Sequence, residues 1–125
     1  MQVRDATVGD LPDVMNVLDG AVLDADATTV RERIAADSVL VAVSGDGERV
    51  LGALVLDGIH IDAVAVRRRR RGQGIGTALV ETAADRRERL TAEFDADLRP
   101  FYEKLGFDIE SAKKPGRLWG ERCSD

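Results

Sequence analysis

The segment from Arg71 to Gly76, which reads Arg-Gly-Gln-Gly-Ile-Gly, constrains the fold of this chain more than any other. An apolar run ending at Val66 precedes it, and an amphipathic stretch beginning at Thr77 follows it. Glycines let backbone N–H groups approach an anion closely, and a helix that starts after them directs its positive end to the same point. The sequence therefore predicts a strand, a glycine-rich turn and a helix that together bind a phosphate group.

The spacing of the glycines distinguishes three kinds of phosphate-binding turn. The dinucleotide fingerprint Gly-x-Gly-x-x-Gly is not completed, because Gly72 and Gly74 are followed by Thr77. A nucleoside-triphosphate loop needs a lysine after its last glycine, and this part of the chain has none. The pattern that remains is Arg-x-x-Gly-x-Gly, formed by Arg71, Gly74 and Gly76.

This pattern resembles the acetyl-CoA-binding motif of the GCN5-related N-acetyltransferase (GNAT) superfamily. Downstream, at the expected distance, the segment from Pro100 to Phe107 is similar to the second signature of that superfamily. The opening from Val3 to Leu11 is also similar to the first strand and first helix of these enzymes, with much lower specificity. Together the three segments bracket nearly the whole chain.

The resemblance implies one domain over residues 1–125 with an α+β fold: a mostly antiparallel mixed β-sheet of about six to seven strands, flanked by about four helices. The chain length also favours a single domain. Hydrophobic periodicity and turn residues predict the same order of elements. The expected strands cover 2–6, 38–43, 49–56, 59–66 and 90–94, with a closing hairpin of 107–109 and 117–122; the expected helices cover 10–18, 28–36, the stretch after the glycines, and 100–105.

By resemblance, acetyl-CoA is the co-substrate and no metal is expected. The backbone of Val64 and Val66 would bond the acetyl carbonyl and the pantetheine arm, and a donor aimed at the thioester oxygen would stabilise the tetrahedral oxyanion. The N–H groups from Gly72 to Thr77 would bind the pyrophosphate. The expected cofactor-binding residues are Val64, Ala65, Val66, Arg71, Gly72, Gln73, Gly74, Ile75, Gly76 and Thr77.

Tyr102 corresponds to the family tyrosine that protonates the departing coenzyme A thiolate. A phenol with an ordinary pKa of about 10 stays protonated at neutral pH and can donate to a thiolate. The alternative is a tyrosine that only packs beside Phe101 and Phe107. Many relatives have an asparagine ahead of this tyrosine, whereas this chain offers Asp95 and Asp97, so the cofactor contact of this loop stays open.

His60 and Asp62 are candidates for the base that accepts a proton from the amine. His60 is the only histidine, and it lies where some family members carry a catalytic glutamate. Imidazoles titrate near neutral pH, which suits proton transfer. Asp62, two residues on, would share a face of the strand in the absence of a bulge, and could then orient His60 or act as the base itself. A water relay, and a His60 that only begins the strand, are further alternatives.

The predicted function is an acyl-CoA-dependent N-acyltransferase that moves acetyl to a primary amine by direct attack in a ternary complex. The alternative is a catalytically silent sensor or interaction module that binds acetyl-CoA or CoA. The amine acceptor is not identified by the sequence. Asp24 and Asp26 would attract a cationic amine or would simply be solvated. The oligomeric state is open, with a homodimer as one alternative.

The composition disfavours a nucleic-acid partner and favours a salt-adapted, cytoplasmic protein. The run from Arg67 to Arg71 could contact nucleic acid, but the net charge is −5 and aromatic residues are scarce, so a nucleic-acid partner is disfavoured. No apolar run is long enough to span a bilayer and no signal peptide is evident, which favours the cytoplasm. Abundant aspartate and only three lysines, Lys104, Lys113 and Lys114, are typical of a salt-adapted protein. The lone Cys123 is expected to be a spare surface thiol.

Overall fold

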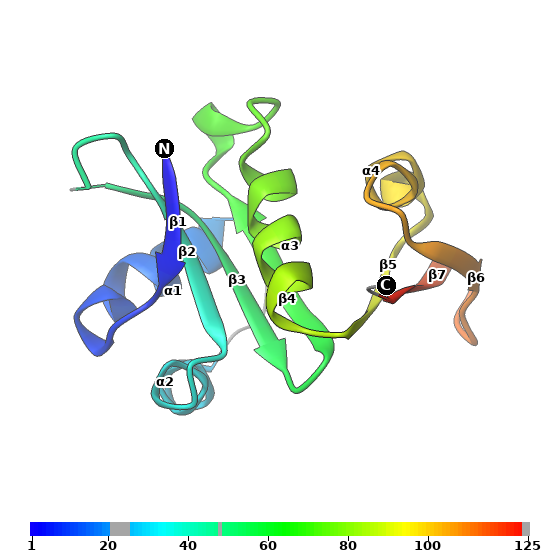
Figure 1. Cartoon of the computed structure of the whole chain (residues 1–125), viewed down its shortest axis with the longest axis horizontal. Coiled ribbons are helices and arrows are strands. Elements are labelled where there is room, and N and C mark those ends of the chain that lie inside the picture. The colour runs from blue at the N-terminus through cyan, green and yellow to red at the C-terminus, as the bar shows by residue number, and fades with distance from the viewer. Residues whose placement is uncertain (21–25, 48, 124–125) are drawn as a thin grey trace.

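The computed structural model describes residues 1–20, 26–47 and 49–123. Its centre is a seven-stranded sheet with the strand order β1-β2-β3-β4-β5-β7-β6 (Figure 1). The strands are β1 (Gln2–Asp5), β2 (Val39–Val43), β3 (Val50–Asp57), β4 (His60–Val66), β5 (Arg89–Asp95), β6 (Asp108–Ser111) and β7 (Arg117–Cys123). The α-helices are α1 (Leu11–Gly20), α2 (Ala27–Ala35), α3 (Ile75–Arg86) and α4 (Arg99–Lys104).

The predicted α+β fold is confirmed. Every neighbouring pair of strands is antiparallel except β4 and β5, which are parallel and are connected through α3. Strand and helix bounds lie close to the expected ranges, because alternating and helical hydrophobic patterns are strong over these segments. No helix in the described part of the chain is long and apolar enough to cross a membrane.

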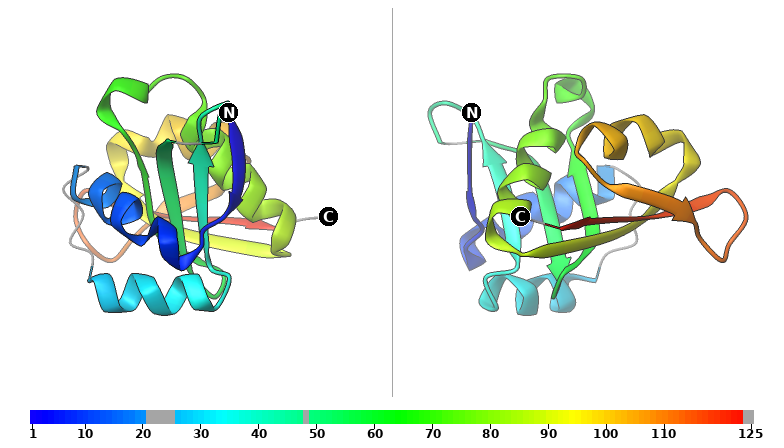
Figure 2. Two further views of the ribbon diagram at one scale, coloured as in Figure 1. Left: turned by 90° about the vertical axis from the view of Figure 1, so that its left-hand side faces the viewer. Right: turned by 45° about the vertical axis from the view of Figure 1, so that its right-hand side comes forward.

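The helices form two layers around the sheet, and each layer has its own core. Buried side chains of α1 and α2 pack with those of β2 and β3 that point to one face of the sheet. On the opposite face, α3 and α4 pack with the alternate residues of the same sheet (Figure 2). Successive strand residues point to opposite faces, so one continuous apolar strand can supply both cores. This explains why β2 is buried along its whole length.

Strands β4 and β5 part soon after they begin. Their register joins His60 to Thr91 and Ile61 to Ala92, and no later residue of β4 has a partner on β5. Beyond this point β4 remains paired to β3 on its other edge, while β5 pairs with β7 over its full length. The facing edges of β4 and β5 are thus left open, toward the turn that leads into α3.

A β-bulge lies in β4 where the strands begin to part. Ile61 is opposite Leu56 and Ala63 is opposite Val55, so Asp62 is an extra residue without a counterpart on β3. A bulge interrupts the strict alternation of faces and re-aims the side chains around it. The condition under which His60 and Asp62 were expected to share a face, a strand without a bulge, is therefore not met.

Gly52 of β3 lets α3 approach the sheet closely. A Cβ atom at this position would lie 2.9 Å from the carbonyl oxygen of Ala65, 3.1 Å from Cγ2 of Ile75 and 3.2 Å from Cδ1 of Leu79. The first of these contacts is with backbone, which cannot move aside without shifting β4. The absence of a side chain at Gly52 thus sets the height of the first turns of α3 above the sheet.

We expect Gly52→Ala to lower the free energy of unfolding by about 1–3 kcal/mol, since overpacking a filled core forces backbone shifts. Gly45→Ala is a matched control, because a Cβ there would have no neighbour within 4 Å and the backbone angle is ordinary. Urea unfolding of both variants measures the difference. Equal stability of the two would mean that α3 can be displaced at no cost.

Candidate functional site

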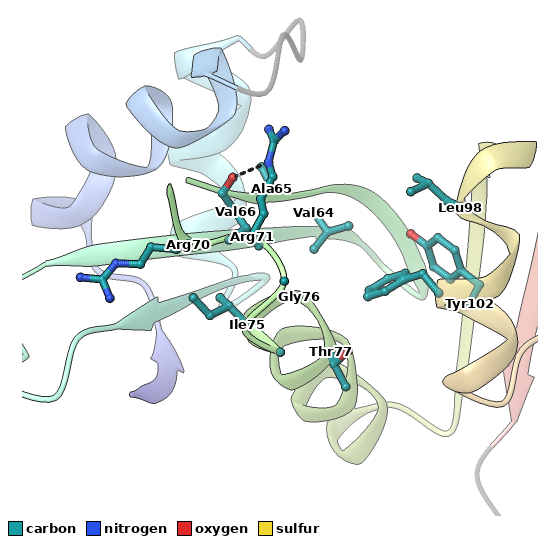
Figure 3. A pocket seen from close by; sticks show the side chains of 13 residues that line it. Val64, Ala65, Val66, Arg70, Arg71, Ile75, Gly76, Thr77, Leu98 and Tyr102 are labelled. Atoms are coloured by element: carbon teal, nitrogen blue, oxygen red, sulfur yellow. Dashed lines mark hydrogen bonds between the residues drawn. The ribbon is translucent and has the colours of Figure 1, made fainter. Parts of the chain in front are cut away.

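A cavity of about 580 Å³ lies between the open edge of β4, the start of α3 and the helix α4 (Figure 3). Two segments that are far apart in the chain bound it: the glycine-rich turn before α3 and the segment that carries Tyr102. The lining residues are Val64, Ala65, Val66, Arg70, Arg71, Gly72, Gly74, Ile75, Gly76, Thr77, Leu98, Phe101 and Tyr102. Of the residues expected to bind a cofactor, only Gln73 is not part of this wall.

The turn before α3 depends on glycine at two positions. Gly72 and Gly74 have φ angles of 80° and 81°, in the left-handed region that other residues avoid. Gly74 is also the N-cap of α3, and the first bond of the helix runs from the N–H of Ala78 to its carbonyl. The N–H groups of the preceding turn have no partner within the helix, so they can bind an anion in the cavity.

Val64 and Val66 bring the end of β4 to the cavity. Their side chains pack against the core under α3 and α4. The edge of β4 that β5 leaves free runs along this wall, which gives a bound molecule unpaired backbone groups to bond. Arg71 folds back over the strand, where its Nε lies 3.4 Å from the carbonyl oxygen of Val66 (Figure 3).

Tyr102 forms part of the opposite wall and is only 3% exposed. Its ring stacks on Phe94 with 4.0 Å between ring centroids, and Phe101 and Phe107 meet it edge-on at 5.0 Å and 5.2 Å. Burial raises the pKa of the Tyr102 hydroxyl to about 12, against a smaller lowering by the positive charge of Arg117. The phenol is therefore fully protonated at neutral pH and can only donate its proton.

His60 and Asp62 do not line the cavity. The Nδ1 atom of His60 lies 2.9 Å from the hydroxyl of Thr91, and its ring stacks on Trp119 with 5.5 Å between centroids. Thr91 lies between Leu90 and Ala92, which face the core under α3 and α4. Alternation therefore places the contact of His60 with Thr91 on the other face of the sheet, where the two strands part.

Asp62 contacts α2 instead of His60. Its carboxylate accepts a hydrogen bond of 2.9 Å from Arg33, which also donates to the carbonyl of Leu56 and lies 3.7 Å from the carboxylate of Asp57. An orienting role of Asp62 toward His60 is thus not present, and the residues that contact the ring are Thr91 and Trp119. Neither was singled out from sequence, since Thr91 is one of several polar residues of the alternating strand β5.

Two of the other acidic candidates, Asp95 and Asp26, have structural partners. Asp95 forms a 2.9 Å ion pair with Arg117, so the loop before α4 contributes Leu98 to the cavity rather than this carboxylate. Asp26 is the N-cap of α2 and accepts from the N–H of Thr28. Asp24 lies outside the described residues. In the described part of the chain, no group of three or more His, Cys, Asp or Glu side chains could hold a metal ion.

The run from Arg67 to Arg70 lines a second space that lies beside the first cavity. Arg67 is fixed by a 2.6 Å bond from its Nε to the carbonyl oxygen of Val50. Arg67, Arg68, Arg69 and Arg70 line a space of about 560 Å³ together with Arg49 and Asn16. Arg70 and Val66 belong to both cavities, so this positive charge is concentrated next to the anion-binding turn.

Comparison with known families agrees with this arrangement. Residues 17–115 match the acetyltransferase (GNAT) domain family, which covers most of the chain, the glycine-rich turn and the segment of Tyr102. The chain belongs to this family. No match was found among curated protein sequences.

Solved structures of other proteins share the fold of this chain at low sequence identity. Rv2747 from Mycobacterium tuberculosis, solved in complex with CoA, is 19% identical over 100% of both chains, with a TM-score of 0.83. N-acetylglutamate synthase from Neisseria gonorrhoeae, complexed with coenzyme A and N-acetyl-glutamate, is 16% identical; the match covers 98% of this chain and 34% of that one, with a TM-score of 0.78. A ribosomal-protein-alanine N-acetyltransferase from Brucella melitensis is 21% identical over 99% of this chain and 100% of its own, with a TM-score of 0.75.

Tyr102 is the only tyrosine, so the titration of this GNAT domain at high pH reports one phenol. We expect the folded protein to show no phenolate near pH 10, the ordinary value, and a midpoint of about 12. In the unfolded chain the Tyr102 hydroxyl ionises at a lower pH than in the folded protein. Its contribution to the free energy of unfolding is therefore fully present below pH 10. It is lost as the pH rises through about 12, and amounts to about 3 kcal/mol.

Absorbance titration of native and urea-unfolded protein measures both midpoints. Tyr102→Phe is the control for stability, since its free energy of unfolding should decline less between pH 10 and 12. A native midpoint near 10 would mean that water reaches the hydroxyl freely.

Proposed function

We propose that this protein transfers an acetyl group from acetyl-CoA to a primary amine by direct attack in a ternary complex. The observation that carries the proposal is the single cavity that joins an anion-binding turn, an open strand edge and a buried phenol. The turn suits a pyrophosphate, the edge suits the amides of a pantetheine arm, and the phenol suits a leaving thiolate. Family membership and the CoA complexes of the two relatives support the same cofactor.

In the proposed reaction the amine nitrogen attacks the thioester carbonyl carbon, and the carbon–sulfur bond breaks. The N–H of Val64 donates to the oxyanion that forms, a contribution of about 3–4 kcal/mol where one such donor has been removed in other enzymes. The Tyr102 hydroxyl gives its proton to the departing thiolate and regains one from solvent. His60, directly or through a water, accepts the proton that the amine loses.

Asp62 is the weaker of the two proposed bases. Its carboxylate is already bonded to Arg33, and accepting a proton would give up that charge-assisted bond. His60 has no ionic partner in the described part of the chain, so protonation costs it no ion pair. We therefore assign the base to His60 and retain Asp62 only as the alternative.

We expect Tyr102→Phe and His60→Ala each to lower kcat by about 10²–10⁴-fold, the usual size of a general acid or base contribution. The affinity for CoA should be nearly unchanged in both, since neither side chain is proposed to hold the cofactor. Release of free thiol from acetyl-CoA, with a panel of small amines and peptides as acceptors, measures turnover. Full turnover in both variants would remove the two proposed roles.

A catalytically silent CoA-binding module is the second candidate. The separation of His60 from the cavity favours it, because a domain that only bound CoA would need the cavity and no base on the far face of the sheet. In that case acetyl-CoA binds but no amine releases thiol at any pH. Isothermal titration with acetyl-CoA, run beside the turnover assay, separates the two candidates.

The acceptor remains a primary amine of unassigned class. The relatives with this fold include an N-acetylglutamate synthase and a ribosomal-protein-alanine acetyltransferase, so the same architecture serves acceptors of different size and charge.

We also propose a cytoplasmic, salt-adapted protein, supported by its net charge of −5. Activity that rises with salt would agree with this, and loss of folding at molar salt would not.

The role of the turn in CoA binding can be tested with two glycines whose backbone is left-handed. We expect Gly74→Ala to weaken CoA affinity at least about tenfold, since a residue with Cβ in the left-handed region costs about 1–2 kcal/mol and the turn relaxes away from the anion. Gly58→Ala is the control. Its φ angle of 61° lies in the same region, so the substitution is strained in the same way, but Gly58 does not line the cavity.

Isothermal titration with CoA measures both affinities, and thermal unfolding without ligand shows whether either variant is damaged. If Gly74→Ala and Gly58→Ala bound CoA equally well, the left-handed turn before α3 would have no part in holding the phosphates.

A further inference from the structure

Thr91 is the one buried polar or charged residue in the described part of the chain, at 4% exposure. It lies in β5, where Leu90, Ala92 and Phe94 face the core under α3 and α4 and Thr91 faces the other side. A hydroxyl taken out of water costs free energy unless it is bonded. Its one side-chain hydrogen bond in the structure is the 2.9 Å contact with Nδ1 of His60.

The position of this contact in the sheet is specific. His60 and Thr91 form the first of the two rungs that join β4 to β5, just before the strands part. The backbone therefore fixes the two residues relative to each other, and the contact does not depend on a mobile loop. Trp119 of β7 restrains the same ring from a third strand, nearly parallel to it at 18°.

We propose that Thr91 is a positioning residue for His60: its hydroxyl oxygen accepts from Nδ1–H, which makes Nδ1 the protonated nitrogen and leaves the lone pair on Nε2. The inference rests on the proposed function, in which His60 accepts a proton from the amine. A neutral imidazole has one donor and one acceptor nitrogen, and the bond made by one nitrogen sets the role of the other.

The proton balance of this arrangement is simple. The amine nitrogen forms its bond to the carbonyl carbon, and the proton it loses is transferred to Nε2. The imidazolium then carries N–H on both nitrogens, with Nδ1–H still bonded to Thr91. Release of the Nε2 proton to water returns the starting tautomer. In the opposite arrangement Thr91 would donate to Nδ1, and Nε2 would carry a hydrogen and could accept nothing.

The single histidine of the chain permits a direct test. In untagged protein at alkaline pH, where imidazoles are neutral, ¹⁵N chemical shifts report which ring nitrogen carries the proton. We expect Nδ1–H in the native protein and in Thr91→Ser, which keeps the hydroxyl. Thr91→Val keeps the branched shape and removes the hydroxyl, so the Nε2–H tautomer should gain population.

The same variants give a kinetic readout. Thr91→Val should lower kcat by about 10- to 100-fold, the usual effect of losing the partner that orients a functional histidine, with KM for acetyl-CoA unchanged. Thr91→Ser should recover most of the loss. Thr82→Val is a matched control, because the Thr82 hydroxyl bonds only the carbonyl of Ala78 within α3.

An Nε2–H tautomer in the native protein overturns the proposal, as does a Thr91→Val variant whose tautomer and kcat match the native protein. The native spectrum and Thr91→Ser decide the matter even if Thr91→Val fails to fold. Failure of the proposed function gives a different result: His60→Ala would then retain full turnover, while the Nδ1–H tautomer and its dependence on Thr91 would still be observed.

Discussion

The parting of β4 and β5 is the constraint on which the rest of this structure depends. Two rungs hold the strands together, and then each follows a different partner, β3 or β7. A continuous sheet would satisfy these edges internally and leave no room for a ligand. Because they are open, the cavity can form, α4 can bring Tyr102 to its far wall, and the turn before α3 can face the same space. The first of the two rungs is formed by His60 and Thr91.

Close packing around the cavity keeps this opening from collapsing. Gly52 lets α3 settle on the sheet, so that its N-terminus is fixed at the end of β4. On the opposite side, Tyr102 is held by Phe94, Phe101 and Phe107, an aromatic cluster that accounts for most of the aromatic residues of the chain. Aromatic side chains bury large areas with few rotatable bonds, so a small domain gains a rigid wall from few residues.

Much of the fold could be predicted because its signals are local. The continuous apolar runs of β2 and β3, the helical spacing of Leu79, Val80 and Ala83, and the glycines at the start of α3 each depend on neighbours in sequence. All the residues expected to bind the cofactor line the cavity except Gln73, whereas Arg70, Leu98 and Phe101 also line it and were not among them. The contact of Asp62 with Arg33 could not be predicted, since it joins β4 to a helix that lies 29 positions away in the sequence.

The sequence by itself determined the order of elements, the anion-binding turn and the segment that carries Tyr102, because each is encoded in the spacing of a few consecutive residues. Only the tertiary structure decided what surrounds His60. Thr91 and Trp119 are 31 and 59 positions away from it in the printed sequence, and β5 and β7 bring them to the ring. Such contacts arise from strand order and register, which the energetics of the whole sheet select and no short motif records.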